Sequence, residues 1–152
     1  MIWSKTKKVM ESLLADSVKK RVQYHVTRYG PGVSQIMTRA WVTWDGDEIA
    51  NMSTIEGLQQ VKEKPEGEDL ATLPGMLSRY AFLSAAEVYL DSSIEQSLAS
   101  DDPIVRAFAM LDRRVGKRRL AKLDVENKHP LVRKFYALRC EAEDLPKPDD
   151  AQ

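Results

Sequence analysis

The chain has 152 residues, of which 43% are hydrophobic and 30% are charged, and its 23 basic residues balance its 23 acidic residues. This composition is typical of a soluble globular domain that folds without disulfides. No apolar run approaches the roughly 18 residues that a membrane span needs, so we expect no membrane association. The single cysteine, Cys140, excludes an internal disulfide and agrees with a reducing, cytoplasmic location. The lysines near the N-terminus precede no apolar block, so we expect no secretory signal.

The first third of the chain predicts one helix followed by three strands. Over residues 3–17, one helical face collects Trp3, Thr6, Met10, Leu13 and Leu14. Apolar and polar residues then alternate, which predicts strands over residues 20–29, 35–44 and 47–55. A turn at residues 30–32 and a two-residue hairpin signal, Asp45-Gly46, separate the strands. We therefore expect a three-stranded antiparallel meander, which the opening helix and the C-terminal half cover.

Residues 57–73 predict an exposed acidic linker, because they combine Pro65 and Gly67 with several acidic side chains. Residues 145–152 predict a disordered tail. The expected organisation is a helix-and-sheet unit over residues 1–56, the linker, a helical unit over residues 74–144 and the tail. The alternative is one compact domain overall.

The C-terminal half contains a sequence repeat. Residues 103–112 and 130–139 carry Pro, Val, Arg, Phe and Leu at the same places, 27 residues apart. Asp102 is a good N-cap, and a proline at the first helical position loses no hydrogen bond. The repeated Val, Phe and Leu share one helical face, so we expect two equivalent helices with Phe108 and Phe135 in the core. Gly116 is expected to end the first copy, and residues 117–125 to form a short second helix.

The Asp-Pro-x-Val-Arg start of the repeat at Asp102 resembles the first helix of HEAT-like repeats. The resemblance implies a short α-solenoid in which acidic and basic side chains link neighbouring units, here Asp101 or Asp102 with Arg133. A weaker third copy precedes these two. Its Leu77, Tyr80 and Leu83 correspond to Val105, Phe108 and Leu111. Its first helix would begin at residues 74–75, and its second helix would span residues 93–99. The predicted class is α+β: an N-terminal helix and three-stranded meander, followed by a short HEAT-like α-solenoid. An ordinary helical bundle is the alternative.

The N-terminal stretch carries a second resemblance. Residues 3–8 and 21–30 read Trp-Ser-Lys-Thr-Lys-Lys and Arg-Val-Gln-Tyr-His-Val-Thr-Arg-Tyr-Gly. They resemble an uncharacterised family of small bacterial cytosolic proteins over roughly the first 45 residues. The resemblance implies a bacterial, cytoplasmic protein and implies no particular chemistry.

Three residues of the expected sheet, His25, Arg39 and Trp41, form a candidate ligand patch. A two-residue hairpin loop pairs Trp41 with Ala50 and Arg39 with Met52, and the loop before the second strand brings His25 opposite Arg39. The polar face of the sheet would then carry Gln23, His25, Arg39, Trp41 and Met52. Such a patch would suit an anionic or aromatic ligand. The alternative is a structural face, with Trp41 covered by the helical half.

A basic cluster is the candidate for nucleic-acid contact. It consists of Arg113, Arg114, Lys117, Arg118, Arg119 and Lys122. Basic clusters bind phosphates, but this chain is neutral overall, and nucleic-acid-binding domains usually have a basic balance. The alternative is a solvated corner that neighbouring acids partly neutralise.

The sequence contains no motif of a catalytic or metal site of the common kinds. His129 precedes a proline and is expected to cap a helix, and Cys140 is expected to be an unreactive core residue. We therefore favour a non-enzymatic protein-interaction module with no cofactor and no metal, whose partner is another protein or a second copy of the chain. Nucleic-acid binding through the basic cluster is the alternative. A small enzyme or a ligand-binding protein that uses the His25 patch is less favoured.

Overall fold

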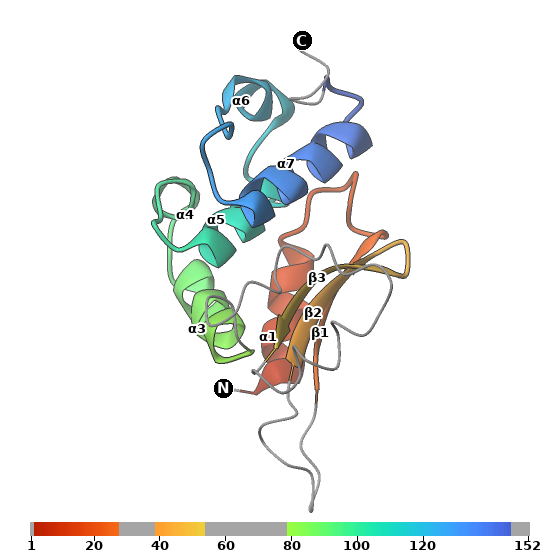
Figure 1. Cartoon of the computed structure of the whole chain (residues 1–152), viewed down its shortest axis with the longest axis vertical. Coiled ribbons are helices and arrows are strands. Elements are labelled where there is room, and N and C mark those ends of the chain that lie inside the picture. Colours follow the sequence, from red (N-terminus) through yellow and green to blue (C-terminus); the bar gives the residue numbers. More distant parts are fainter. Residues whose placement is uncertain (1, 28–38, 54–78, 147–152) are drawn as a thin grey trace, which may run out of the picture.

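The computed structural model of the chain describes residues 2–27, 39–53 and 79–146. It confirms the predicted α+β class, with an N-terminal helix, a three-stranded antiparallel sheet and then a series of helices (Figure 1). In chain order the elements are α1 (Trp3–Ser12), β1 (Val22–Val26), β2 (Arg39–Trp44), β3 (Asp47–Ser53), α3 (Arg79–Leu90), α4 (Ile94–Leu98), α5 (Pro103–Met110), α6 (Lys117–Lys122) and α7 (Pro130–Ala142). The predicted turn at residues 30–32, the acidic linker, the opening of the third copy and most of the tail lie outside the described residues.

The sheet has the predicted order, with β2 between β1 and β3 and antiparallel to both. Asp45 and Gly46 form the predicted two-residue hairpin turn, and both have positive φ, 53° and 86°. Positive φ at both central residues defines the type I′ turn, whose twist matches that of paired strands. A β-bulge then interrupts the pairing of β2 with β3, so that Val42 pairs with Ala50. Beyond the bulge, β3 is displaced by one residue from a regular hairpin.

Helix α1 ends at Ser12, earlier than the predicted residue 17. The Ala15 amide donates to the Leu111 carbonyl at 2.9 Å, and the Arg113 amide donates to the Leu13 carbonyl at 2.8 Å. The chain after α1 therefore pairs with the segment that follows α5 instead of adding another helical turn. Such pairing with a distant segment leaves no local sequence signal.

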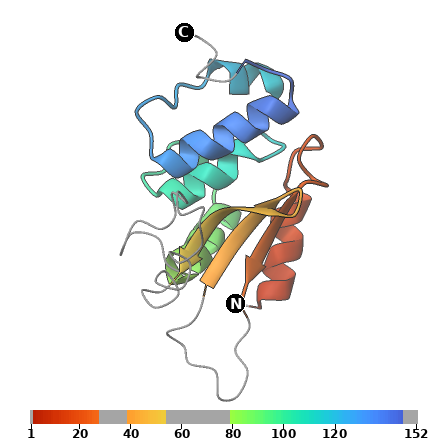
Figure 2. The ribbon, with the colours of Figure 1, turned by 45° about the vertical axis from the view of Figure 1, so that its right-hand side comes forward.

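Helices α1 and α3 lie next to each other on one face of the sheet, α1 against β1 and α3 against β2 and β3 (Figure 1 and Figure 2). Aromatic rings fill the space between the layers. The ring centre of Phe82 lies 5.7 Å from that of Trp3 and 6.4 Å from that of Tyr24. Phe108 of α5 lies 5.5 Å from both Tyr24 and Phe82. The core of the sheet layer therefore continues into the helical half.

The two copies of the repeat form α5 and α7, as predicted, and the two helices pack against each other. Each helix begins at its proline. The Asp102 carboxylate accepts from the Ile104 amide at 2.9 Å, and His129 Nδ1 accepts from the Leu131 amide at 3.0 Å. Both predicted caps are thereby confirmed, and each satisfies an amide that the first helical turn leaves unpaired.

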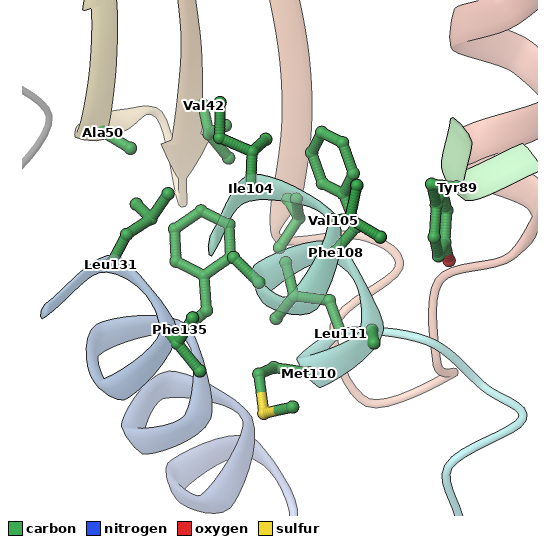
Figure 3. Close-up of a cluster of buried hydrophobic side chains, with 14 of the residues drawn as sticks. Val42, Ala50, Tyr89, Ile104, Val105, Phe108, Met110, Leu111, Leu131 and Phe135 are labelled. Carbon is green, nitrogen blue, oxygen red and sulfur yellow. The ribbon is translucent and has the colours of Figure 1, made fainter. Parts of the chain in front are cut away.

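Phe108 and Phe135 occupy the core, as predicted, and each is only 1% exposed. Figure 3 shows Phe135 and Leu131 of α7 pointing toward the same space as Ile104 of α5, next to Val42 and Ala50 of the sheet. The helical half therefore packs on the sheet through the faces that the repeat marks as apolar. The free thiol of Cys140 is buried among these helices, as predicted.

Three details of the predicted repeat are wrong. Neither Asp101 nor Asp102 forms an ion pair with Arg133, since Asp102 caps its own helix and Asp101 and Arg133 are exposed to solvent, so the predicted link between the two units does not form. Gly116 does not end the first helix, because α5 ends at Met110 and Gly116 is the N-cap residue of α6. Helix α6 ends at Lys122, three residues before the predicted end.

The predicted register of the third copy is also wrong. Tyr80, the expected equivalent of Phe108, is 56% exposed, whereas Phe82 is completely buried. The second helix of that copy forms as α4, with a complete capping box between Ser93 and Gln96. The helix α3 therefore turns a different face to the core from the one that the repeat alignment predicts.

Candidate functional site

The predicted patch residues His25, Arg39 and Trp41 share the outer face of the sheet, which points away from α1 and α3. The neighbouring positions Tyr24 and Val42 point the other way and are buried in the core. His25, Arg39 and Trp41 are all half-buried. The helices that contact the sheet lie on its opposite face, so the expected structural alternative, Trp41 beneath the helical half, does not occur among the described residues.

The predicted register of the patch is wrong in two places. His25 lies opposite Trp41 rather than Arg39, and the backbone of Arg39 instead accepts a hydrogen bond from the Thr27 amide. Met52 belongs to the core and is 0% exposed, because the bulge in β3 turns it inward. These shifts change the neighbours of the patch but keep its three residues together.

The three side chains stack on one another. The rings of His25 and Trp41 are nearly parallel, with centres 5.0 Å apart. The Arg39 guanidinium carbon lies 4.2 Å from the centre of the Trp41 ring, a cation–π distance. Arg39 also forms an ion pair with Glu48 of β3, and its buried Nε atom has no hydrogen-bond partner among the described residues. The patch is therefore a fixed aromatic platform with one unused donor.

Burial lowers the pKa of His25, and the positive charges of Lys7 and Arg39 add to this effect. The imidazole is therefore neutral at pH 7. Its Nε2 atom shares a hydrogen bond of 2.9 Å with the Thr43 hydroxyl. Since Glu48 neutralises Arg39, the patch is better suited to stacking with a flat group than to holding an anion.

The basic cluster is only partly free. Arg114 forms a bidentate ion pair with Asp112, with its Nη2 atom 2.7 Å from the carboxylate. Arg119 lies 3.2 Å from Glu95 on the surface. The other members are exposed and make no ion pair with a described residue, and these are Arg113, Lys117, Arg118 and Lys122. The cluster thus keeps four solvent-exposed charges along α6 and in the turn before it.

Asp112 is the centre of a buried polar network that the sequence did not reveal. It is 0% exposed and accepts hydrogen bonds from the Tyr89 hydroxyl and from the Arg114 guanidinium. Burial, together with the Asp112 charge, raises the pKa of Tyr89, so the phenol stays protonated and donates. Asp112 therefore connects α3 to the turn that follows α5.

Arg139 completes this network from α7. Its guanidinium donates to the carbonyl oxygens of Met110, Asp112 and Val115 at 3.0, 3.0 and 2.7 Å. These carbonyls lie at and beyond the end of α5, where helical partners are missing. Burial lowers the pKa of Arg139 from its ordinary value, but the side chain remains a cation at any physiological pH. One feature of the sequence indicated this contact, because Arg139 is adjacent to Cys140, which was expected on the inward face of its helix.

The outward surface of α1 and α3 carries a group of exposed apolar side chains. Among the described residues the exposed large apolar side chains are Ile2, Val9, Tyr80 and Val88, at 60%, 49%, 56% and 50% exposure. Ile2 is the N-cap residue of α1 and Val9 lies in the second half of that helix, and the other two lie on α3. Sequence reasoning missed this surface, although Val9 lies off the predicted apolar face of its helix and thus was a usable signal. We call these residues the α1–α3 surface.

The part of the chain that the structure describes also bears on two other features, metal sites and membrane-spanning helices. No group of three or more His, Cys, Asp or Glu side chains there is placed to hold a metal ion. No described helix is both long enough and apolar enough to cross a bilayer.

Comparison with known proteins gives one match. The model of the SF0329 protein family matches residues 2–140. Comparisons with curated proteins and with solved structures gave no match. The matched region begins just before α1 and ends within α7, so it includes the sheet, the α1–α3 surface and both copies of the repeat. Because the match spans most of its length, the chain belongs to the SF0329 protein family.

Proposed function

We propose that this protein is a non-enzymatic protein-interaction module that binds its partner through the α1–α3 surface. One observation carries the proposal: the four exposed large apolar side chains of the described residues all lie on α1, its N-cap and the adjacent helix α3. Single exposed apolar residues are common on any protein, but a group of them on one surface is typical of a contact site.

The helices behind this surface are rigidly held, which favours binding. Trp3 of α1 packs on Phe82 of α3, and Tyr89 anchors α3 to Asp112. Lys7 and Glu11 of α1 both bond to the backbone of Tyr24 in β1, at 2.7 and 3.2 Å. A surface that is already ordered loses less conformational entropy when a partner binds.

The proposal also includes the repeat class and the cellular location that the sequence predicts. We infer that α4 to α7 form a short HEAT-like array, and the equivalent prolines, caps and buried phenylalanines of α5 and α7 support this. We also infer a bacterial, cytoplasmic protein, which the N-terminal resemblance and the free, buried thiol of Cys140 support.

Affinity capture from native cells tests the proposal. The wild-type chain, Val88→Asp and Asn127→Asp serve as separate baits. Asn127 is exposed in the turn before α7, so its variant adds the same charge away from the α1–α3 surface. We expect a specific partner that the wild type and Asn127→Asp retain and Val88→Asp loses. A partner that all three baits retain equally would contradict the assignment of this surface.

Nucleic-acid binding is the second candidate function. The observation that favours it is the set of four exposed basic residues around α6, which form no ion pair with a described residue. Against it, Arg114 is committed to Asp112 within the fold, and the chain as a whole is neutral. A mobility-shift experiment, described in the Discussion, tests this function.

Ligand binding at His25, Arg39 and Trp41 is the remaining candidate, and the unused Nε donor of Arg39 favours it. Iodide quenching of Trp41 fluorescence tests whether a ligand can reach the platform. Trp3 and Trp44 are first replaced by phenylalanine, so that Trp41 is the only emitter. A ligand site would be supported if iodide quenches Trp41 and an added flat aromatic compound reduces this quenching. Emission that resists iodide would eliminate it.

A further inference from the structure

We propose that the partner on the α1–α3 surface is a second copy of this chain, an inference that rests on the proposed function. The two helices carry opposite charges next to their exposed apolar residues. Lys5 and Lys8 of α1 are exposed, as are Glu87 and Asp91 of α3. None of these four forms an ion pair with another described residue, and each is therefore available to a partner.

Helical spacing places these charges beside the apolar residues. On α1, Lys5 lies three residues after Ile2 and four residues before Val9, so the three share one side of the helix. On α3, Glu87 lies seven residues after Tyr80, and Asp91 lies three residues after Val88, so each acid shares a side of the helix with an exposed apolar residue. Each helix thus presents an apolar stripe with charge of one sign.

Other charges on the two helices do not cancel this difference. On α1, Glu11 is neutralised by Lys7, whose Nζ lies 2.5 Å from its carboxylate. On α3, Arg79 is half-buried at the first position and lies 5.6 Å from the centre of the Tyr80 ring. The outward face of α1 is therefore basic, and the outward face of α3 is acidic over its last two turns.

Two-fold symmetry makes such a surface complementary to itself. Because α1 and α3 lie side by side on one face of the sheet, a two-fold axis that runs between them in the plane of contact places α1 of each copy on α3 of the other. Each of these contacts pairs apolar residues with apolar residues and lysines with acids, and symmetry forms the contact twice.

Other occupants match the surface less well. An anionic lipid surface or a nucleic acid would attract α1 but would be repelled by Glu87 and Asp91 of α3. The helices have 10 and 12 residues and so are only about 15 and 18 Å long. A contact of this size is at the small end of specific interfaces, so we expect association that is reversible and depends on protein concentration.

Sedimentation equilibrium of charge-reversed chains tests this inference. One variant carries Lys5→Glu and Lys8→Glu, so both of its helices are acidic, and the other carries Glu87→Lys and Asp91→Lys, so both are basic. The wild type should rise from the monomer mass of 17.3 kDa toward twice that mass as its concentration increases. Each variant alone should remain monomeric, and an equimolar mixture of the two should associate. Circular dichroism melting of each chain checks that it is folded.

A wild type that stays at the monomer mass up to about 1 mM would overturn the inference. An association that neither pair of reversals weakens would also overturn it, because the contact would then lie elsewhere. Sedimentation with vesicles of phosphatidylcholine and phosphatidylserine tests a membrane as the partner. If a monomeric chain binds these vesicles and the binding requires Lys5 and Lys8, the partner is a membrane surface and the second copy is wrong. If the chain is monomeric but Val88→Asp still loses a captured protein, the second copy is wrong and the proposed function stands. If the chain is monomeric and Val88→Asp retains every captured protein, both the second copy and the proposed function are wrong.

Discussion

Truncation of Phe108 to alanine should destabilise the fold more than the same change at Phe135. Both side chains are 1% exposed, and removing a buried phenylalanine ring costs about 3–5 kcal/mol. Phe108 also has ring neighbours at 5.5, 5.5 and 5.3 Å, namely Tyr24, Phe82 and Tyr89. Such pairs contribute about 0.5–1.5 kcal/mol each beyond burial. We therefore expect Phe108→Ala near the upper end of the range and Phe135→Ala near the lower end.

Urea unfolding, followed by far-ultraviolet circular dichroism, measures the difference. A shift of the midpoint at constant slope would report a loss of stability alone. Phe108→Leu serves as a matched control, because it keeps most of the volume but loses the ring contacts, and it should cost about 1–2 kcal/mol. Since domains of this kind have only about 5–15 kcal/mol in total, Phe108→Ala should lose about a third or more of the stability of the fold. A Phe108→Ala midpoint within error of the wild type, or a larger loss of stability for Phe135→Ala, would contradict this prediction.

Three further predictions concern the helical half. Replacing Arg139 by methionine should cost about 2–4 kcal/mol in urea unfolding, because three buried carbonyl oxygens lose their donor, and an unchanged midpoint would show that they have other partners. Burial lowers the pKa of His129, so the unfolded chain binds more protons than the folded chain and stability should be lost as the pH falls below about 6.5. His129→Asn keeps a helix cap but cannot titrate in this range, so its stability should depend less on pH, as measured by urea unfolding at several pH values. Mobility-shift assays with DNA and RNA should show no binding at about 0.15 M salt, and binding there that is lost on replacing Arg118 and Arg119 would contradict our preferred function.

Local signals predicted the elements that depend on local chemistry. The Asp45-Gly46 turn, the helix start at Pro103 and the caps at Asp102 and His129 each follow from the preferences of a few adjacent residues. Alternation predicted which face of β1 and β2 is buried. These features need no knowledge of distant contacts.

Features that depend on distant contacts were missed. The early end of α1 requires pairing with the segment after α5, and the buried Asp112 requires Tyr89 and Arg114. The bulge in β3 reversed the expected orientation of Met52, because a shift of one residue turns a strand side chain to the other face. Likewise Tyr80 looked like a core residue only by alignment with Phe108, whereas packing selected Phe82.

The central claim is that this protein binds a second copy of itself through the outward face of α1 and α3. A dilution series of two-dimensional amide NMR spectra, from about 1 mM to about 20 μM, tests it most directly. We expect concentration-dependent shifts confined to the exposed positions of α1 and α3, with Val9 and Val88 among the largest. Spectra that do not change with concentration, or shifts at His25 and Trp41 or along α6 with α1 and α3 unchanged, would contradict it.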